Sequence, residues 1–140
     1  MFNPTRDEVR DFFSGVWRKH RAREVMTPLE NQALDWVLEH PEYHALLEAP
    51  AAARTREWTP EAGELNPFLH LSMHLSVAEQ IAIDQPPGIR GEFQRLSRKH
   101  DSLHEAAHDV LECLGETLWR AQSAGLPPDG AAYLECVKRK

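Results

Sequence analysis

Residues 66–84 read NPFLHLSMHLSVAEQIAID, the longest mostly apolar run in the chain. The Asn-Pro start provides an N-cap and a first-turn proline, and the following QPPG predicts a sharp stop. With 3.6 residues per turn, His70 and His74 project from the same face as Val77. The stretch therefore predicts a central helix whose apolar face carries two histidines one turn apart.

A second histidine-rich stretch, HDSLHEAAHDVLECLGE at residues 100–116, is expected to face the first. Stacked imidazoles on an apolar stripe need polar partners, because unsatisfied buried polar groups are costly. One metal ion would satisfy several imidazoles at once, as in helical bundles whose core holds His and carboxylate ligands. The sequence therefore predicts an inter-helix metal site with five ligands: His70, His74, His104, His108 and Glu112.

The chemistry of such a site is left open by the sequence. Nitrogen and oxygen ligands suit Zn, Fe, Mn or Ni equally, so the divalent ion is not distinguished. If the protein is an enzyme, a metal-activated water is the simplest chemistry, and Glu105 or Glu116 is the nearest predicted acid or base. Residues 104–108 also match H-E-x-x-H, but no strand is visible to align a peptide, which disfavours a zinc peptidase.

The remaining histidines and the cysteines are expected to be structural. His40 lies at a predicted helix end, and His20 and His100 are interpreted as polar groups at helix edges. Cys113 points away from the histidine edge, which indicates packing. Two cysteines without CxxC spacing are too few for a disulfide framework.

The rest of the chain also predicts helices. Capping-box spacing and apolar periodicity indicate helices over 5–23 and 27–40, then a short helix after Pro41 and another after Asp129. Residues 89–124 are predicted helical as one helix, or as two with a break near Asp101. Residues 49–65 are predicted irregular, forming either a binding loop or a connection pinned by Trp58. Together these features predict an all-α, compact bundle of five to seven helices in a single domain, 1–140.

Composition narrows the class of protein. The chain has 140 residues, 41% of them apolar, and a net charge of −6. The acidic net charge argues against general binding to nucleic acid, because a protein's affinity for nucleic acid comes mainly from basic side chains that neutralise phosphates. No apolar run is long enough to cross a membrane, and the N-terminus has no secretory pattern. With two cysteines, these features favour a cytoplasmic location.

Several segments resemble a known family over nearly the whole chain. They include MFNPTRDEVRDFF, NPFLHLSMHL, HEAAHDVLECLGETLWRAQ and PPDGAAYLECV. The chain resembles the uncharacterised proteobacterial family numbered 1841 in the domain-of-unknown-function series. The resemblance implies a small bacterial protein and implies no chemistry.

Two other interpretations remain open. In the first, the protein is non-catalytic, its apolar stripes and the 49–65 segment form a surface for a protein partner or a homodimer, and the histidines only donate and accept hydrogen bonds. In the second, which is weaker, Arg18–Arg23 and Arg90–Lys99 contact nucleic acid, and binding would then depend strongly on salt.

Overall fold

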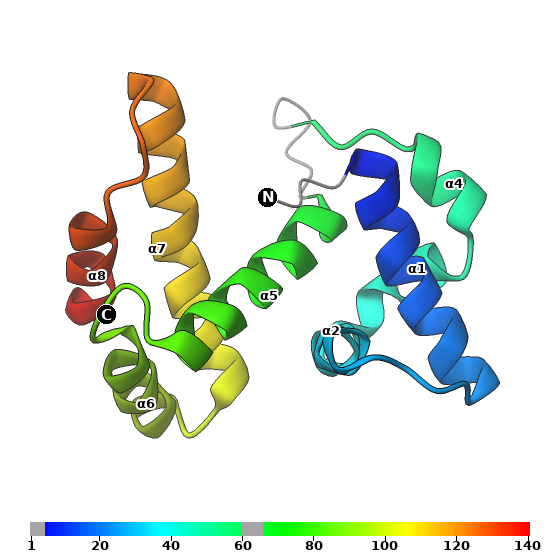
Figure 1. Cartoon of the computed structure of the whole chain (residues 1–140), viewed down its shortest axis with the longest axis horizontal. Helices are drawn as coiled ribbons and strands as arrows, with labels where there is room; N and C mark the ends of the chain where they lie inside the picture. Colours follow the sequence, from blue (N-terminus) through cyan, green and yellow to red (C-terminus); the bar gives the residue numbers. More distant parts are fainter. Residues whose placement is uncertain (1–4, 60–65) are drawn as a thin grey trace. The chain divides into compact units, whose positions relative to one another are not determined.

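The structure is a computed structural model that describes residues 5–59 and 66–140. Within these ranges every regular element is a helix (Figure 1), which confirms the predicted all-α class. The contacts divide the chain into two compact units, Met1–Ser72 and Met73–Lys140. Each unit is described by itself below, and the single domain over 1–140 stays a prediction.

The described helices outnumber the predicted five to seven, because several are only one or two turns long. The first unit contains α1 (Arg6–Ala22), α2 (Pro28–Leu38), the 3-10 turn η1 (Pro41–Tyr43), α3 (His44–Leu47) and α4 (Pro50–Thr55). Helix α5 (Pro67–Ile83) begins in the first unit and continues in the second, which then adds α6 (Ile89–His100), α7 (Leu103–Ala124) and α8 (Gly130–Arg139). No described helix is long and apolar enough to cross a membrane.

Helix α1 is the centre of the first unit, and α2, α3 and α4 pack against it. It begins with the predicted capping box, in which Thr5 and Glu8 satisfy each other's backbone N–H groups. Its side chains Phe13 and Val16 are fully buried. Burial of this apolar stripe is what keeps an otherwise strongly charged helix in place.

Helix α4 corrects the prediction that residues 49–65 are irregular. It covers Pro50–Thr55, and a proline at its first turn followed by alanines explains why it forms. Buried Arg10 of α1 donates hydrogen bonds to the carbonyls of Ala53 and Arg56, both at 2.8 Å, and so anchors the end of α4. The predicted role of Trp58 agrees, since its ring lies 5.0 Å from the Arg10 guanidinium. Residues 60–65 of that prediction lie outside the described residues.

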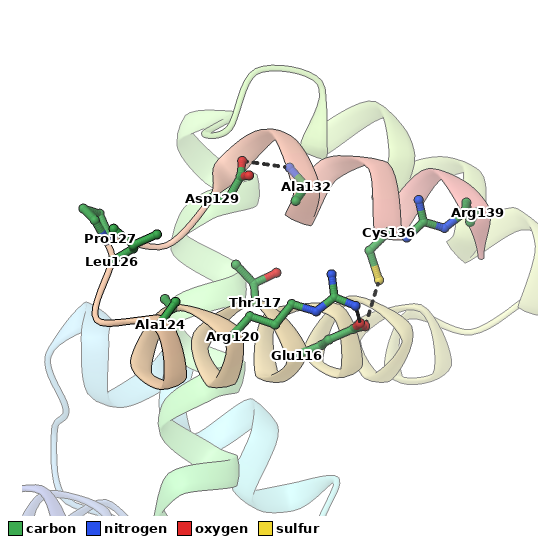
Figure 2. A pocket seen from close by; sticks show the side chains of 11 residues that line it. Glu116, Thr117, Arg120, Ala124, Leu126, Pro127, Asp129, Ala132, Cys136 and Arg139 are labelled. Carbon is green, nitrogen blue, oxygen red and sulfur yellow. Dashed lines mark hydrogen bonds and ion pairs between the residues drawn. The ribbon is translucent and has the colours of Figure 1, made fainter.

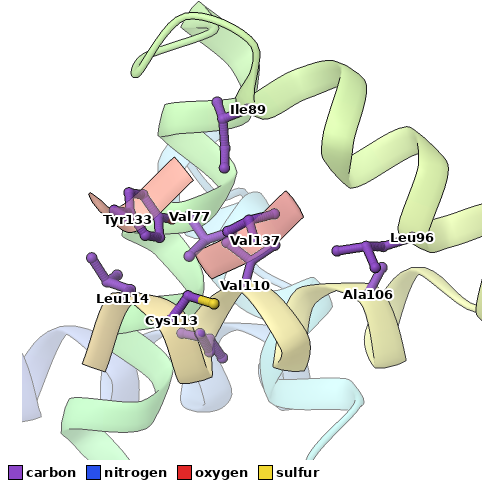
Figure 3. Packing of buried hydrophobic residues seen from close by; sticks show 10 residues of the cluster. Val77, Ile89, Leu96, Ala106, Val110, Cys113, Leu114, Tyr133 and Val137 are labelled. Carbon is purple, nitrogen blue, oxygen red and sulfur yellow. The ribbon is translucent and has the colours of Figure 1, made fainter. Parts of the chain in front are cut away.

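The second unit has its own apolar core, drawn in Figure 3. Val77 of α5, Val110 of α7 and Val137 of α8 are fully or almost fully buried in it. Two specific links add to this packing. The hydroxyl of Tyr133 donates to Gln80 at 2.6 Å, and a disulfide joins Cys113 to Cys136. Helix α8 is thereby attached to both α5 and α7.

The ends of the central helix follow the predicted signals. The side chain of Asn66 accepts hydrogen bonds from two first-turn N–H groups of α5, at 2.9 and 3.3 Å. At the other end Asp84 has a left-handed backbone, and its carboxylate accepts from the N–H groups of Gly88 and Arg90. The Arg90 guanidinium in turn donates to the last carbonyls of α5. Both ends of the histidine-bearing helix are therefore fixed by polar side chains.

Residues 89–124 form two helices, which settles the alternative that the sequence left open. Asp101 has a left-handed backbone with φ 53°, and Ser102 accepts from the N–H of Glu105 as an N-cap. The break lets α7 begin at Leu103, one residue before His104.

Candidate metal centre

The N-terminal half of α7 positions two of the predicted ligands. Because His104 and His108 are one turn apart, their side chains lie on one face of the helix. Their Nε2 atoms are 3.1 Å apart and their ring centroids 4.3 Å apart. Both side chains are half-buried. The pair forms the i,i+4 arrangement that the sequence predicts.

Helix α5 adds a third imidazole to this pair. His74 is fully buried, and its ring centroid lies 5.1 Å from that of His108 and 6.0 Å from that of His104. The ligand nitrogens of these three side chains all lie within 4.8 Å of one another. Three of the five predicted ligands, from two helices, are therefore brought together in the second unit.

The spacing of these nitrogens can be compared with that of known metal sites. Zinc–nitrogen bonds are about 2.0–2.1 Å long, so two imidazole nitrogens on one ion are about 2.9 Å apart at a right angle and about 3.4 Å apart at a tetrahedral angle. The His104–His108 separation of 3.1 Å lies within this range. The ligand nitrogen of His74 lies within 4.8 Å of both, so side-chain movement of at most about 1.5 Å brings it into the range. The three residues can therefore hold one metal ion.

In the first unit His70 contacts His40. Their Nε2 atoms are 3.0 Å apart, and the rings meet edge to face with centroids 4.8 Å apart. His40 Nδ1 lies 2.7 Å from the carbonyl oxygen of Trp36, which can only accept, so this nitrogen carries the proton. His40 Nε2 is then the nitrogen that faces His70, and Nδ1 is held by a backbone carbonyl, as it is in many metal-ligating histidines.

His40 is the histidine that the sequence interpretation treated as a helix-end residue. It does lie at a helix end, as the N-cap of η1, and it is also buried and stacks on Tyr43 with ring centroids 5.3 Å apart. Burial with the nearby Glu42 raises the pKa of Tyr43, so its phenol stays protonated at neutral pH. The i,i+4 spacing of His40 and His44 is the sequence signal that singles out His40, and η1 continues the chain between the two in a helical turn.

The three predicted carboxylates lie on exposed parts of α7. Glu112 is one turn beyond His108, outside the three-imidazole group, and pairs with the Lys140 ammonium at 3.0 Å. Glu105 is exposed between the two α7 histidines. Glu116 is eight residues beyond His108, about 12 Å along the helix axis, and pairs with Arg120 at 2.6 Å.

The other histidines have structural partners. His100 Nε2 pairs with the Asp109 carboxylate at 2.6 Å. His44 stacks on Trp17 with ring centroids 4.0 Å apart, and its Nε2–H donates to the carbonyl of Val37. The cysteines depart from the packing interpretation in part: Cys113 is fully buried as expected, but it is bonded to Cys136. Their spacing of 23 residues gave no sequence signal for this bond.

The basic run at the end of α1 is largely paired with carboxylates. Arg18 contacts Glu24 at 2.7 Å, Lys19 contacts Glu30 at 2.8 Å, and Arg21 contacts Glu48 at 3.0 Å. Such pairs reduce the positive charge that a phosphate backbone would meet.

Comparison with known proteins gives a family without an activity. A family model described as a domain of unknown function (DUF1841) matches residues 5–139. No curated protein and no solved structure matches the chain. What the protein does must therefore be argued from the geometry of its own residues.

Proposed function

The chain belongs to the DUF1841 family, and we propose from its histidine geometry that it binds a divalent transition-metal ion. The observation that most supports this proposal is the group of three imidazoles, His74, His104 and His108, whose ligand nitrogens lie within 4.8 Å of one another. Imidazole is a ligand for zinc, iron, nickel and copper, whereas calcium and magnesium prefer oxygen. The three imidazoles therefore favour a transition-metal ion between hard and soft in character, such as zinc.

Two further ligands, His70 and Glu112, are proposed from their spacing in the sequence. His70 precedes His74 by one turn on the same helix, and Glu112 follows His108 by one turn, so the i,i+4 spacing supports both as further ligands. Glu112 would have to exchange its Lys140 partner for the ion. Its side chain is 71% exposed, and an exposed ion pair of this kind contributes little, so the exchange costs little.

When only His74, His104 and His108 bind the ion, a coordination position is left for water, as in catalytic zinc sites. An ion at this site would acidify such a water, and an exposed carboxylate next to it could accept the proton. Glu105, between the two histidines of α7, is the predicted base in that case. Glu116 is the less favoured candidate, because it lies farther from His108 along the helix axis.

Metal content measured on protein purified without a histidine tag tests the proposal. We expect close to one equivalent of a transition metal per chain by elemental analysis. His74→Ala or His108→Ala should lower the zinc affinity at least about 100-fold, because each removes a direct ligand. His100→Ala is the matched control, since His100 pairs with Asp109, and it should retain the affinity. Equal zinc binding by all four proteins would refute the proposal.

A second candidate is a protein-interaction role, favoured by exposed apolar side chains at the C-terminal end of α7. Trp119 is 67% exposed and Leu126, just after the helix, is 66% exposed. Tryptophan is enriched among residues that dominate binding energy at protein interfaces. If this surface forms a homodimer, sedimentation velocity at micromolar concentration should show a dimer that Trp119→Ala converts to monomer. A wild-type monomer at every concentration would exclude the homodimer.

A further inference from the structure

We propose that the pocket between α7 and α8 is a thiol-exchange site, at which a small thiol attacks Cys136 and opens the Cys113–Cys136 disulfide. The pocket has a volume of about 220 Å³ and is lined by the C-terminal half of α7, the following turn and α8. Figure 2 shows the Cys136 side chain extending from α8 into this space, next to Glu116.

The two sulfurs differ in access. Cys113 is fully buried in the core of the second unit, whereas Cys136 is half-buried and lines the pocket. A thiolate must approach along the S–S axis from the side opposite the leaving sulfur. Cys136 lines the pocket and Cys113 does not, so we assign the attack to Cys136 and the departure to Cys113.

The exchange is balanced without a further oxidant. A thiolate RS⁻ forms a bond to Cys136 Sγ, the Cys113–Cys136 bond breaks, and Cys113 leaves as a thiolate that takes a proton. A second thiol then attacks the mixed disulfide on Cys136, which releases the Cys136 thiol and the oxidised disulfide RSSR. A disulfide of the same class reverses both steps.

Charges around the pocket control the first step. Glu116 Oε2 lies 3.9 Å from Cys136 Sγ, so its negative charge opposes an approaching thiolate. Arg120 pairs with the same carboxylate at 2.6 Å and reduces this repulsion. Removing the carboxylate charge should therefore accelerate the attack.

Opening the disulfide would act on the proposed metal centre, and this part of the inference rests on the proposed function. Helix α8 links the two ligand-bearing helices of the second unit. Tyr133 bonds to Gln80 of α5, six residues after His74, and Cys136 bonds to Cys113 of α7, five residues after His108. Reduction removes the covalent link to α7, so the three imidazoles lose part of their support.

Glutathione, a small peptide thiol, is the probe for the exchange. Wild-type protein is incubated with glutathione, quenched with acid, alkylated and mapped by mass spectrometry. We expect the mixed disulfide on Cys136 and the alkyl group on Cys113. An adduct on Cys113, or no adduct under conditions that modify the urea-unfolded protein, would overturn the exchange site.

Two variants that each remove one negative charge test whether the charge in the pocket, rather than general access to Cys136, controls the rate of exchange. Glu116→Gln should accelerate formation of the Cys136 adduct about threefold or more, because a charge close to the sulfur is removed. Glu92→Gln removes a charge in the same unit, on α6, where Glu92 pairs with Arg95 outside the pocket. It should leave the rate unchanged, and equal rates in both variants would contradict the assignment.

The link to the metal centre is tested by zinc titration of wild type and Cys113→Ser/Cys136→Ser. We expect zinc affinity at least about threefold weaker in the variant, with helicity retained by circular dichroism. If the variant does not fold, wild type reduced with a phosphine and desalted replaces it. Equal affinities would refute the link and leave metal binding standing. Absence of zinc binding in wild type would refute the proposed function, while the glutathione mapping would still decide the exchange.

Discussion

At the scale of single residues, tautomers and partners decide what each histidine can do. The carbonyl of Trp36 holds the proton on His40 Nδ1, and the carbonyl of Val37 holds it on His44 Nε2. His40 and His44 therefore present different nitrogens although they are one turn apart. Residue type and spacing, which are all that the sequence offers, do not contain this difference.

Arg10 gives a residue-scale prediction for the first unit. Its guanidinium donates to the carbonyls of Ala53, Arg54 and Arg56 while the side chain is only 4% exposed. Arg10→Ala should lower the free energy of unfolding by about 2–4 kcal/mol, because buried carbonyls lose their donors and a packed side chain is removed.

Urea denaturation measures this change, and Arg18→Ala on the same helix is the control. The Arg18–Glu24 pair is exposed on both sides, so this control should change stability by less than about 0.5 kcal/mol. Similar losses in the two variants would mean that Arg10 does not anchor α4.

At the scale of elements, the long helices were predictable because periodicity, caps and breakers agree there. Thr5, Thr27, Ser102 and Asp129 each cap the helix that follows. Helix α4 was missed because its six residues are too short to show a period, and because Arg10, which anchors its end, is 43 residues away from Ala53 in sequence. The site was predictable only in part. Local spacing shows which histidines form i,i+4 pairs on one helix, but packing determines which residues of other helices contact them.

The start of α2 gives an element-scale prediction about pH. The hydrogen bond from Lys19, then those from the Thr27 backbone and side chain, hold the pKa of Glu30 below its usual 4.5. A carboxylate with a lowered folded pKa stabilises the fold above its unfolded pKa, and this contribution is lost as pH falls through the lowered value.

Thermal unfolding from about pH 6 to about pH 3 tests this dependence. Wild type should be more stable than Glu30→Gln at the upper end, and the difference should shrink as the pH falls. Lys19→Met removes the same hydrogen bond from the other side, so it should flatten the dependence similarly. A difference that stays constant across the range would show that Glu30 titration does not contribute.

At the scale of the whole molecule, the chain has two compact units, and helix α5 belongs to both. Each unit holds an imidazole pair with Nε2 atoms about one hydrogen-bond length apart, His40 with His70 and His104 with His108. In the second unit the apolar core and the disulfide lie beside the imidazole group on the same helices. Composition predicted a folded protein and periodicity with caps predicted its helices, but the division into units depends on contacts that no local pattern records.

Zinc-edge X-ray absorption of the tag-free, zinc-loaded protein tests the central claim most directly, because it counts and identifies the ligand atoms. We predict at least three imidazole nitrogens at about 2.0–2.1 Å and no sulfur at about 2.3 Å. The imidazole count should fall in His108→Ala. Failure to load zinc, or a first shell of sulfur or of oxygen alone, would contradict the account.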